Sequence, residues 1–383
     1  MTSAQRPSLL VIALPIVAIV LFALTVGATI GIAGSTLGYD FHAYEGAARR
    51  LLDGDRMYDP AIDVAGGFAI YLYPPPFALA IVPLAIVGGQ AAVGIWIGLM
   101  TAAFLAGVAL LPVTRNVRWL VLLLGALDWP VVYSIKLGQV GPLLLLLFAI
   151  GWRVVGTPTR PCPPGGRIAL GTAIALGAIV KVQPALLLGW AALIGRWRVI
   201  AVAVAVGIVA ALIATAVAGT QPWFDYPALL GRVSSPLTTP HNFTPGAIAY
   251  QAGVPEGIAA GIQWASVAAA LVAVVIAART RTAEASYLVA VVASQLISPL
   301  LWDHYAMLLL LPVAWLLERR QWWAVLIPLA TSIVVVGIVP SAIYPVVFGA
   351  SLLAPIVVGG RGSPVVPADD AATDPAMTLD SAL

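Results

Sequence analysis

The chain has 383 residues, of which 61% are hydrophobic and only 9% are charged, and its mean hydropathy is +1.01. This composition excludes a water-soluble domain, and the apolar runs that recur along the whole chain predict an all-α polytopic membrane protein. The formal net charge of +3 is spread too thinly for nucleic-acid binding. The single cysteine, Cys162, excludes an internal disulfide, and no Cys/His spacing predicts a metal site or other cofactor.

The first apolar run, residues 9–33, is about 25 residues long, whereas a signal-peptide core is roughly 7–15 residues, so a retained helix is expected. The stretch 77–112 is too long for one crossing and should break at Gly88-Gly89. The short helices 168–180 and 184–195 should cross as a half-length pair, which gives ten to twelve crossings in all. In chain order, helices are expected at residues 9–33, 77–112, 117–133, 139–155, 168–180, 184–195, 199–219, 256–278, 284–298, 304–317, 324–339 and 346–358.

Charge divides the segments between these helices into two sets. Most of the nineteen basic residues fall in one set, which the positive-inside rule places in the cytoplasm together with both chain ends. Most of the sixteen acidic residues fall in the other set, which includes two long outer loops at 34–76 and 220–255. We therefore expect one transmembrane catalytic domain, residues 1–358, followed by a disordered cytoplasmic tail at 359–383.

The first outer loop carries "GYDFHAYEGAARRLLDGDRMYD", residues 38–59, an unusual concentration of charge for this chain. Tyr44, Ala47 and Ala48 begin an apolar face at helical spacing, so a short helix on the membrane surface is expected. Asp40 lies at the start of that helix. Its carboxylate is read either as the N-cap of the helix or as a catalytic group at the membrane edge, and the two roles are compatible. Just beyond, Tyr71 and Tyr73 are read as part of an interfacial aromatic belt.

Further ionisable residues fall at predicted outer helix ends. Lys136 lies in "SIKLGQVGP" and Lys181 in "IVKVQPALL", and both are candidates to bind a lipid-linked phosphate. The alternative for Lys136 is a lysine that snorkels to the interface. Asp303 and His304 follow "SPLLW"; the imidazole is a candidate phosphate ligand or proton carrier, and the alternative is a merely interfacial polar pair.

Three more residues are candidates for substrate binding. His241 lies in "TTPHNFTPG" of the second outer loop, while Tyr44 and Gln139 lie in the motifs around Asp40 and Lys136. The chain contains no GxxxxGK[ST] loop, no GxGxxG after a strand and no HExxH motif. An enzyme with this sequence would therefore need a substrate already activated in the lipid.

Five motifs occur in the order "DFHAYEGAARRLLDGDRMYD", "YLYPPPFALAIVPLA", "KLGQVGPLLLLL", "KVQPALLL" and "SPLLWDHYAMLLLLP", across residues 38–312. In these motifs the chain resembles glycosyltransferase family 87, membrane mannosyltransferases of GT-C architecture that use polyprenyl-phosphate-mannose. The resemblance implies that Asp40 is the catalytic base, that His304 binds the donor and that Lys181 matches a lysine before a proline at a helix end. The family often has two histidines where this chain has His304 and Tyr305.

The resemblance and the residues together predict an inverting glycosyltransferase in the plasma membrane. It would move a sugar, mannose by analogy, from a polyprenyl-phosphate donor to a lipid or glycan acceptor on the outer face, with no metal. One alternative is a transporter or flippase of a lipid-linked or small polar substrate, and another is a non-catalytic assembly subunit. Charges at the membrane midplane would favour transport, whereas clustering at outer helix ends favours an enzyme.

Overall fold

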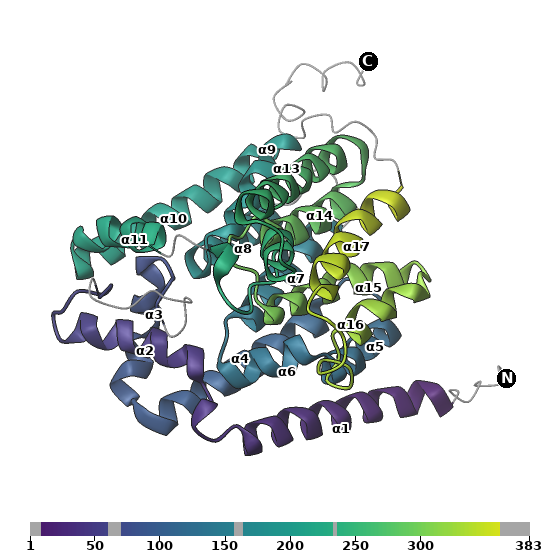
Figure 1. Cartoon of the computed structure of the whole chain (residues 1–383), viewed down its shortest axis with the longest axis horizontal. Helices are drawn as coiled ribbons and strands as arrows, with labels where there is room; N and C mark the ends of the chain where they lie inside the picture. Colours follow the sequence, from purple (N-terminus) through teal and green to yellow (C-terminus); the bar gives the residue numbers. More distant parts are fainter. Residues whose placement is uncertain (1–8, 60–69, 157–163, 233–235, 361–383) are drawn as a thin grey trace, which may run out of the picture.

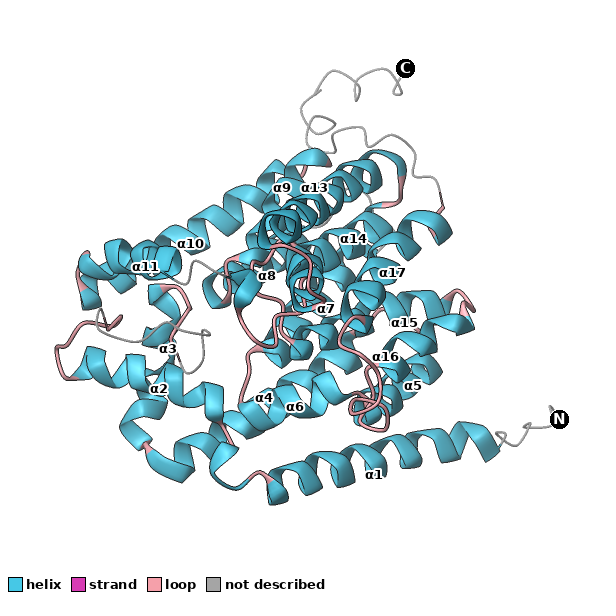
Figure 2. Ribbon diagram, in the orientation of Figure 1, coloured by secondary structure: helices cyan, strands magenta, loops and turns pink. Residues whose placement is uncertain are grey.

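A computed structural model describes residues 9–59, 70–156, 164–232 and 236–360 of the chain. Within these ranges the protein is all α-helical and contains no β-strand (Figure 1, Figure 2). The predicted tail 359–383 lies outside the described residues except for its first two. The α-helices are α1 Leu9–Ile32, α2 Tyr39–Leu52, α3 Pro75–Val87, α4 Gly89–Leu110, α5 Arg115–Leu127, α6 Trp129–Leu137, α7 Gly141–Gly156, α8 Pro164–Val180, α9 Leu186–Leu193, α10 Trp197–Ala218, α11 Gln221–Arg232, α12 Pro245–Gln251, α13 Glu256–Thr280, α14 Ala283–Leu296, α15 Leu310–Glu318, α16 Leu326–Ala330 and α17 Ile343–Val358.

The helices confirm a polytopic membrane protein. In the described part of the chain, four are long and apolar enough to span a membrane, namely most of α1 together with α4, α10 and α13. Helices α6 and α7 pass the same test only as a pair, bent by 118°. Other apolar helices, such as α8 and α14, have 10–17 residues and are too short to cross unaided. The predicted ten to twelve crossings, which count these shorter helices, stay a prediction.

The expected break in 77–112 is confirmed. Helix α3 ends at Val87 and α4 begins at Gly89, with Gly88 at φ 67°. This backbone conformation favours glycine, and a Cβ at Gly88 would also collide with the guanidinium of Arg49. The turn therefore leaves room for an α2 side chain, and α2 packs closely against α3.

The helix predicted after the first apolar run is confirmed as α2, its place on the membrane surface stays a prediction, and the N-cap interpretation of Asp40 is wrong. Gly38 is the N-cap at φ 71°, and Asp40 lies within the first turn. The backbone N–H of Gly38 donates to the Lys136 carbonyl oxygen at 2.8 Å, which joins the start of α2 to the end of α6. Tyr44, Ala47 and Ala48 are buried, as the spacing predicts. Since Tyr71 and Tyr73 are buried as well, the interfacial aromatic belt expected for them is also wrong.

The expected helix 324–339 is wrong beyond residue 330. The chain leaves α16 and pairs with the junction between α5 and α6. Ile333 N–H donates to the Leu127 carbonyl at 2.8 Å, and Trp129 N–H donates to the Thr331 carbonyl at 3.1 Å. The Thr331 hydroxyl donates to the buried Asp128 carboxylate at 2.7 Å. A helix break in apolar surroundings leaves backbone groups without partners, and this segment supplies them.

Helix α8 leads to Lys181 and is held closely against α10 at Gly171. A Cβ at Gly171 would lie 2.7 Å from the carbonyl oxygen of Val199 and 2.7 Å from Cβ of Val202. Small residues at such contacts let two membrane helices approach backbone to backbone. The glycine thereby sets the distance between α8 and α10.

We expect Gly171→Ala to destabilise the protein by about 1–3 kcal/mol, because overpacking forces two backbones apart. Thermal unfolding in detergent would measure the loss as a lower midpoint. Gly207→Ala in α10 is the matched control, since a Cβ there meets nothing within 4 Å. Equal midpoints for the two variants would contradict the close contact.

Candidate active site

All eight residues singled out from the sequence line one cavity of about 840 Å³. The start of α2, the α6–α7 junction, the turn after α8 and the segment from α14 to the 3₁₀ helix Asp303–Leu309 meet around it. The segment before α3, helix α11 and the stretch around His241 complete the lining. In Figure 1, α2 and α11, which belong to the two long outer loops of the prediction, lie at the same end of the molecule. The eight cavity-lining candidates are Asp40, Tyr44, Lys136, Gln139, Lys181, His241, Asp303 and His304.

A hydrogen-bond chain fixes the Asp40 carboxylate. Gln139 Nε2 donates to Asp40 Oδ2 at 2.6 Å. The hydroxyls of Tyr44 and Tyr73 each lie 3.3 Å from Gln139 Oε1 and 2.8 Å from each other. An ionised Asp40 carboxylate only accepts hydrogen bonds, so Gln139 turns its amide nitrogen to Asp40 and its Oε1 to the two hydroxyls. Gln139 is 6% exposed, so the amide is held in this orientation inside the protein.

The environment of Asp40 favours its protonated form. Helix α2 is not one of the membrane spans. Burial raises the pKa of Asp40 above its ordinary value of 3.8, and this effect outweighs the opposing influence of His304, the Gln139 hydrogen bond and Lys181. A carboxylate with a raised pKa is a better proton acceptor near neutral pH than an exposed one.

Lys181 follows α8 directly and faces two aromatic rings. Its Nζ lies 3.8 Å from the centroid of the Tyr305 ring and 5.8 Å from that of Tyr73. Cation–π contacts of this kind stabilise an ammonium group away from water. Among the described residues, no carboxylate forms an ion pair with Lys181. Burial lowers the pKa of Lys181 to about 7, and the nearby charge of Asp40 opposes this effect. An anionic ligand in the cavity would favour the ammonium form.

Asp303 and His304 form a second charged group. The Asp303 carboxylate accepts from the His304 backbone N–H at 2.7 Å and from Trp129 Nε1 at 3.0 Å, and its Oδ1 lies 3.5 Å from His304 Nδ1. Burial raises the pKa of Asp303, but the hydrogen bonds and charge of His304 bring it below its ordinary value. His304 is 4% exposed, and its Nε2 has no hydrogen-bond partner among the described residues. A buried ring nitrogen without a protein partner on a cavity wall is free to hydrogen-bond to a bound molecule.

Lys136 and His241 complete the predicted set at the edges of the cavity. Lys136 Nζ lies 5.5 Å from the Tyr133 ring centroid. His241 is exposed and has φ 59°. Its neighbour Asn242 is fully buried and supports the cavity wall: its Oδ1 accepts from Leu301 N–H at 3.0 Å and its Nδ2 donates to the Pro299 carbonyl at 3.0 Å.

Sequence reasoning missed part of the lining. The rings of Tyr73 and Tyr305 face Lys181, and Gln183 Nε2, two residues along the chain, donates to Ser298 Oγ at 2.9 Å. Aromatic and amide side chains are too common in membrane proteins to stand out individually. One feature of the sequence could have singled out Tyr305: it stands where glycosyltransferase family 87 often has a second histidine. Within the described residues, no group of three or more His, Cys, Asp or Glu side chains could hold a metal ion.

We expect Asp40→Asn to raise the thermal unfolding midpoint at pH 7. A pKa raised by folding means that the ionised carboxylate destabilises the folded state above that pKa, and the amide removes this cost. The gain should shrink as pH falls through the raised pKa and vanish below 3.8. Asp53→Asn, at the exposed end of α2, is the control and should leave the midpoint unchanged. A lower midpoint for Asp40→Asn would contradict the assigned electrostatics.

Comparison with known proteins assigns the chain to a family. The model of glycosyltransferase family 87 matches residues 71–300, more than half of the chain. No curated protein matches the chain, and no solved structure matches it. The matched range contains Gln139 and Lys181, while Asp40 precedes it and His304 follows it. The chain is a glycosyltransferase and belongs to glycosyltransferase family 87.

Proposed function

We propose that the protein is an inverting glycosyltransferase that moves mannose from a polyprenyl-phosphate donor to a lipid or glycan acceptor at the outer face of the plasma membrane. The observation that carries the proposal is one cavity in which a positioned carboxylate, Asp40, shares the lining with the amine of Lys181 and the imidazole of His304. Family membership supports a sugar donor and acceptor. The predicted topology supports the outer face, where no nucleotide is available and a lipid-linked donor is needed.

The cationic side of the cavity suits the donor phosphate. As the bond to the sugar breaks, negative charge grows on the phosphate oxygens. Lys181, held over the Tyr305 ring, offers a compact positive charge. His304 offers Nε2, which is buried without a partner and would hydrogen-bond to a phosphate oxygen. Lys136, at the edge, would add long-range attraction for the anion.

The carboxylate side suits the acceptor. Asp40 would take the proton of the acceptor hydroxyl while that oxygen attacks the anomeric carbon. Gln139 would hold the carboxylate in line, with its own orientation fixed by Tyr44 and Tyr73. One base and one direct displacement invert the anomeric carbon, so a β-linked donor would give an α-linked product. No resident metal is assigned a role in this mechanism.

Asp40→Asn should lower the transfer rate by about 10²–10⁴-fold, the range for loss of a general base. Purified protein would be given polyprenyl-phosphate-mannose and a lipid acceptor, and the mannosylated product measured. Asp53→Asn should keep full activity. Undiminished transfer by Asp40→Asn would reject the base. Movement of the donor across proteoliposomes without transfer would instead favour the transporter alternative.

We expect kcat/KM to fall as pH is lowered through the raised pKa of Asp40, because the base must be ionised in the free enzyme. Gln139→Leu removes a hydrogen bond that lowers this pKa, so its pH profile should shift toward higher pH. Tyr73→Phe keeps the amide beside Asp40 and should shift the profile less. A Gln139→Leu enzyme with an unshifted profile and reduced kcat would limit Gln139 to packing.

A further inference from the structure

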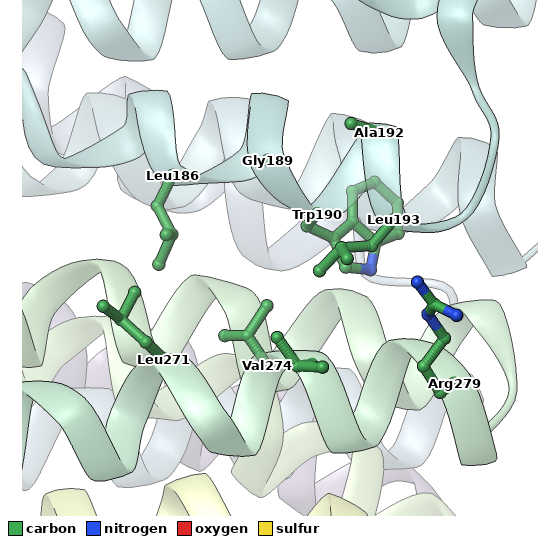
Figure 3. Close-up of a pocket in the computed structure, with 9 residues that line it drawn as sticks. Leu186, Gly189, Trp190, Ala192, Leu193, Leu271, Val274 and Arg279 are labelled. Carbon is green, nitrogen blue, oxygen red and sulfur yellow. The ribbon is translucent and has the colours of Figure 1, made fainter.

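A second cavity, of about 410 Å³, lies between α9 and α13, and none of the charged groups of the candidate active site lines it. Figure 3 shows the two helices side by side with the groove between them. The lining is apolar along its length and ends in a single arginine. It consists of Leu186, Gly189, Trp190, Ala192, Leu193, Leu271, Val274, Val275 and Arg279.

The floor of the groove is buried and its rim is exposed. Trp190 and Val274 are 0% and 3% exposed and form the floor. Leu271 and Val275 on α13 are 40% and 45% exposed. At Gly189, in the middle of α9, an added Cβ would meet nothing within 4 Å. The groove is therefore open toward the hydrocarbon that surrounds α13, a candidate membrane span, and the missing side chain of Gly189 leaves room in it.

Arg279 makes one end of the groove charged, while the rest of the lining is apolar. It lies in the last turn of α13, is exposed, and forms no ion pair with any described residue. In Figure 3 its side chain extends from α13 toward the Trp190–Leu193 part of α9. Arg196 and Arg198 follow α9 directly in the sequence. Leu186 and Leu271, at the opposite end, are purely apolar.

We propose that this groove binds one anionic glycerophospholipid, with its phosphate on Arg279 and an acyl chain along the α9–α13 seam. Leu271 and Arg279 are eight residues apart on one helix, which corresponds to about 12 Å of groove. Basic pockets between membrane helices suit anionic head groups on the cytoplasmic side, where the basic-residue pattern places Arg279. An amphiphile matches both ends of the groove, whereas a polyprenyl chain threaded from the active site would place its apolar end on the guanidinium.

The lipid would also support the active site. Leu186 lines both cavities, and it lies five residues after Lys181. An acyl chain against Leu186 would fill the space behind that wall. The proposal does not depend on the reaction assigned to the cavity, because lipid retention is measured without donor or acceptor.

Native mass spectrometry of the full-length protein in detergent would test this site. Phosphatidylglycerol and phosphatidylcholine with identical acyl chains would be added in equal amounts. We expect phosphatidylglycerol to be retained at least about tenfold better, a difference of about 1.4 kcal/mol. Arg279→Gln should abolish this preference, and Gly189→Leu should reduce retention of both lipids by filling the groove. Arg115→Gln, at an exposed arginine on α5, is the control and should change neither.

Equal retention of the two lipids by the unaltered protein would overturn the proposal, and so would unchanged retention by Gly189→Leu. Displacement of bound phosphatidylglycerol by polyprenyl phosphate, but not by excess phosphatidylglycerol of another chain length, would overturn it as well. Free glycerol 3-phosphate should not displace the lipid, because it lacks the acyl chain. Displacement by it would reduce the site to an anion contact and would also overturn the proposal. Gly189→Leu keeps the test independent of any folding defect in Arg279→Gln, since leucine favours a helix over glycine.

Discussion

Backbone groups freed where a helix stops in apolar surroundings must find partners, and the candidate active site lies among such helix ends. Around the large cavity, helices stop at the α6–α7 junction, after α8, and after α14. At each stop the freed groups are satisfied locally: Gln139 N–H donates to the Ser134 carbonyl, Lys181 N–H to the Gly177 carbonyl, and Ser298 N–H to the Gln295 carbonyl. These stops present Gln139, Lys181 and the Asp303–His304 pair to one space. Polar chemistry is thus concentrated where the backbone is irregular.

The hydrogen bond from Gln139 to Asp40 joins two of the elements that form the site. Helix α2 begins where Gly38 N–H donates to the Lys136 carbonyl, so the start of α2 and the end of α6 are fixed to each other by backbone and side chain together. Phe41, the residue directly after Asp40, stacks on Trp96 of α4 at a centroid distance of 5.5 Å. Trp96 Nε1 in turn donates to the Gly138 carbonyl at 2.7 Å. The carboxylate is therefore placed by a rigid corner rather than by a loop, as positioning for catalysis requires.

The sequence predicts most helices and the charged part of the site because charge is rare in this chain. Asp40, Lys181 and His304 stand out against apolar runs, and each lies on the cavity wall. The same reasoning fails where a tertiary contact replaces a local preference. Residues beyond 330 are as apolar as a membrane helix, but backbone groups of Thr331 and Ile333 pair with the α5–α6 junction instead of continuing the helix. Tyr73 looked like an interfacial residue because a single tyrosine carries no signal of its partner. Only the fold shows that the Tyr73 hydroxyl meets the Tyr44 hydroxyl and helps to orient Gln139.

Lysine and arginine occupy different places in this chain. The chain has only two lysines, Lys136 and Lys181, and both line the cavity, whereas all other basic side chains are arginines or histidines. A lysine ammonium is a compact charge with three rotatable donors that can follow a phosphate as its charge changes. An arginine guanidinium is planar, always charged and weakly hydrated, which suits a permanent position at a membrane surface. Arg279, beside an apolar groove, is such an arginine: it would keep its charge at a fixed place near the membrane surface. The division predicts that phosphate in transit is handled by lysine, and phosphate held in place by arginine.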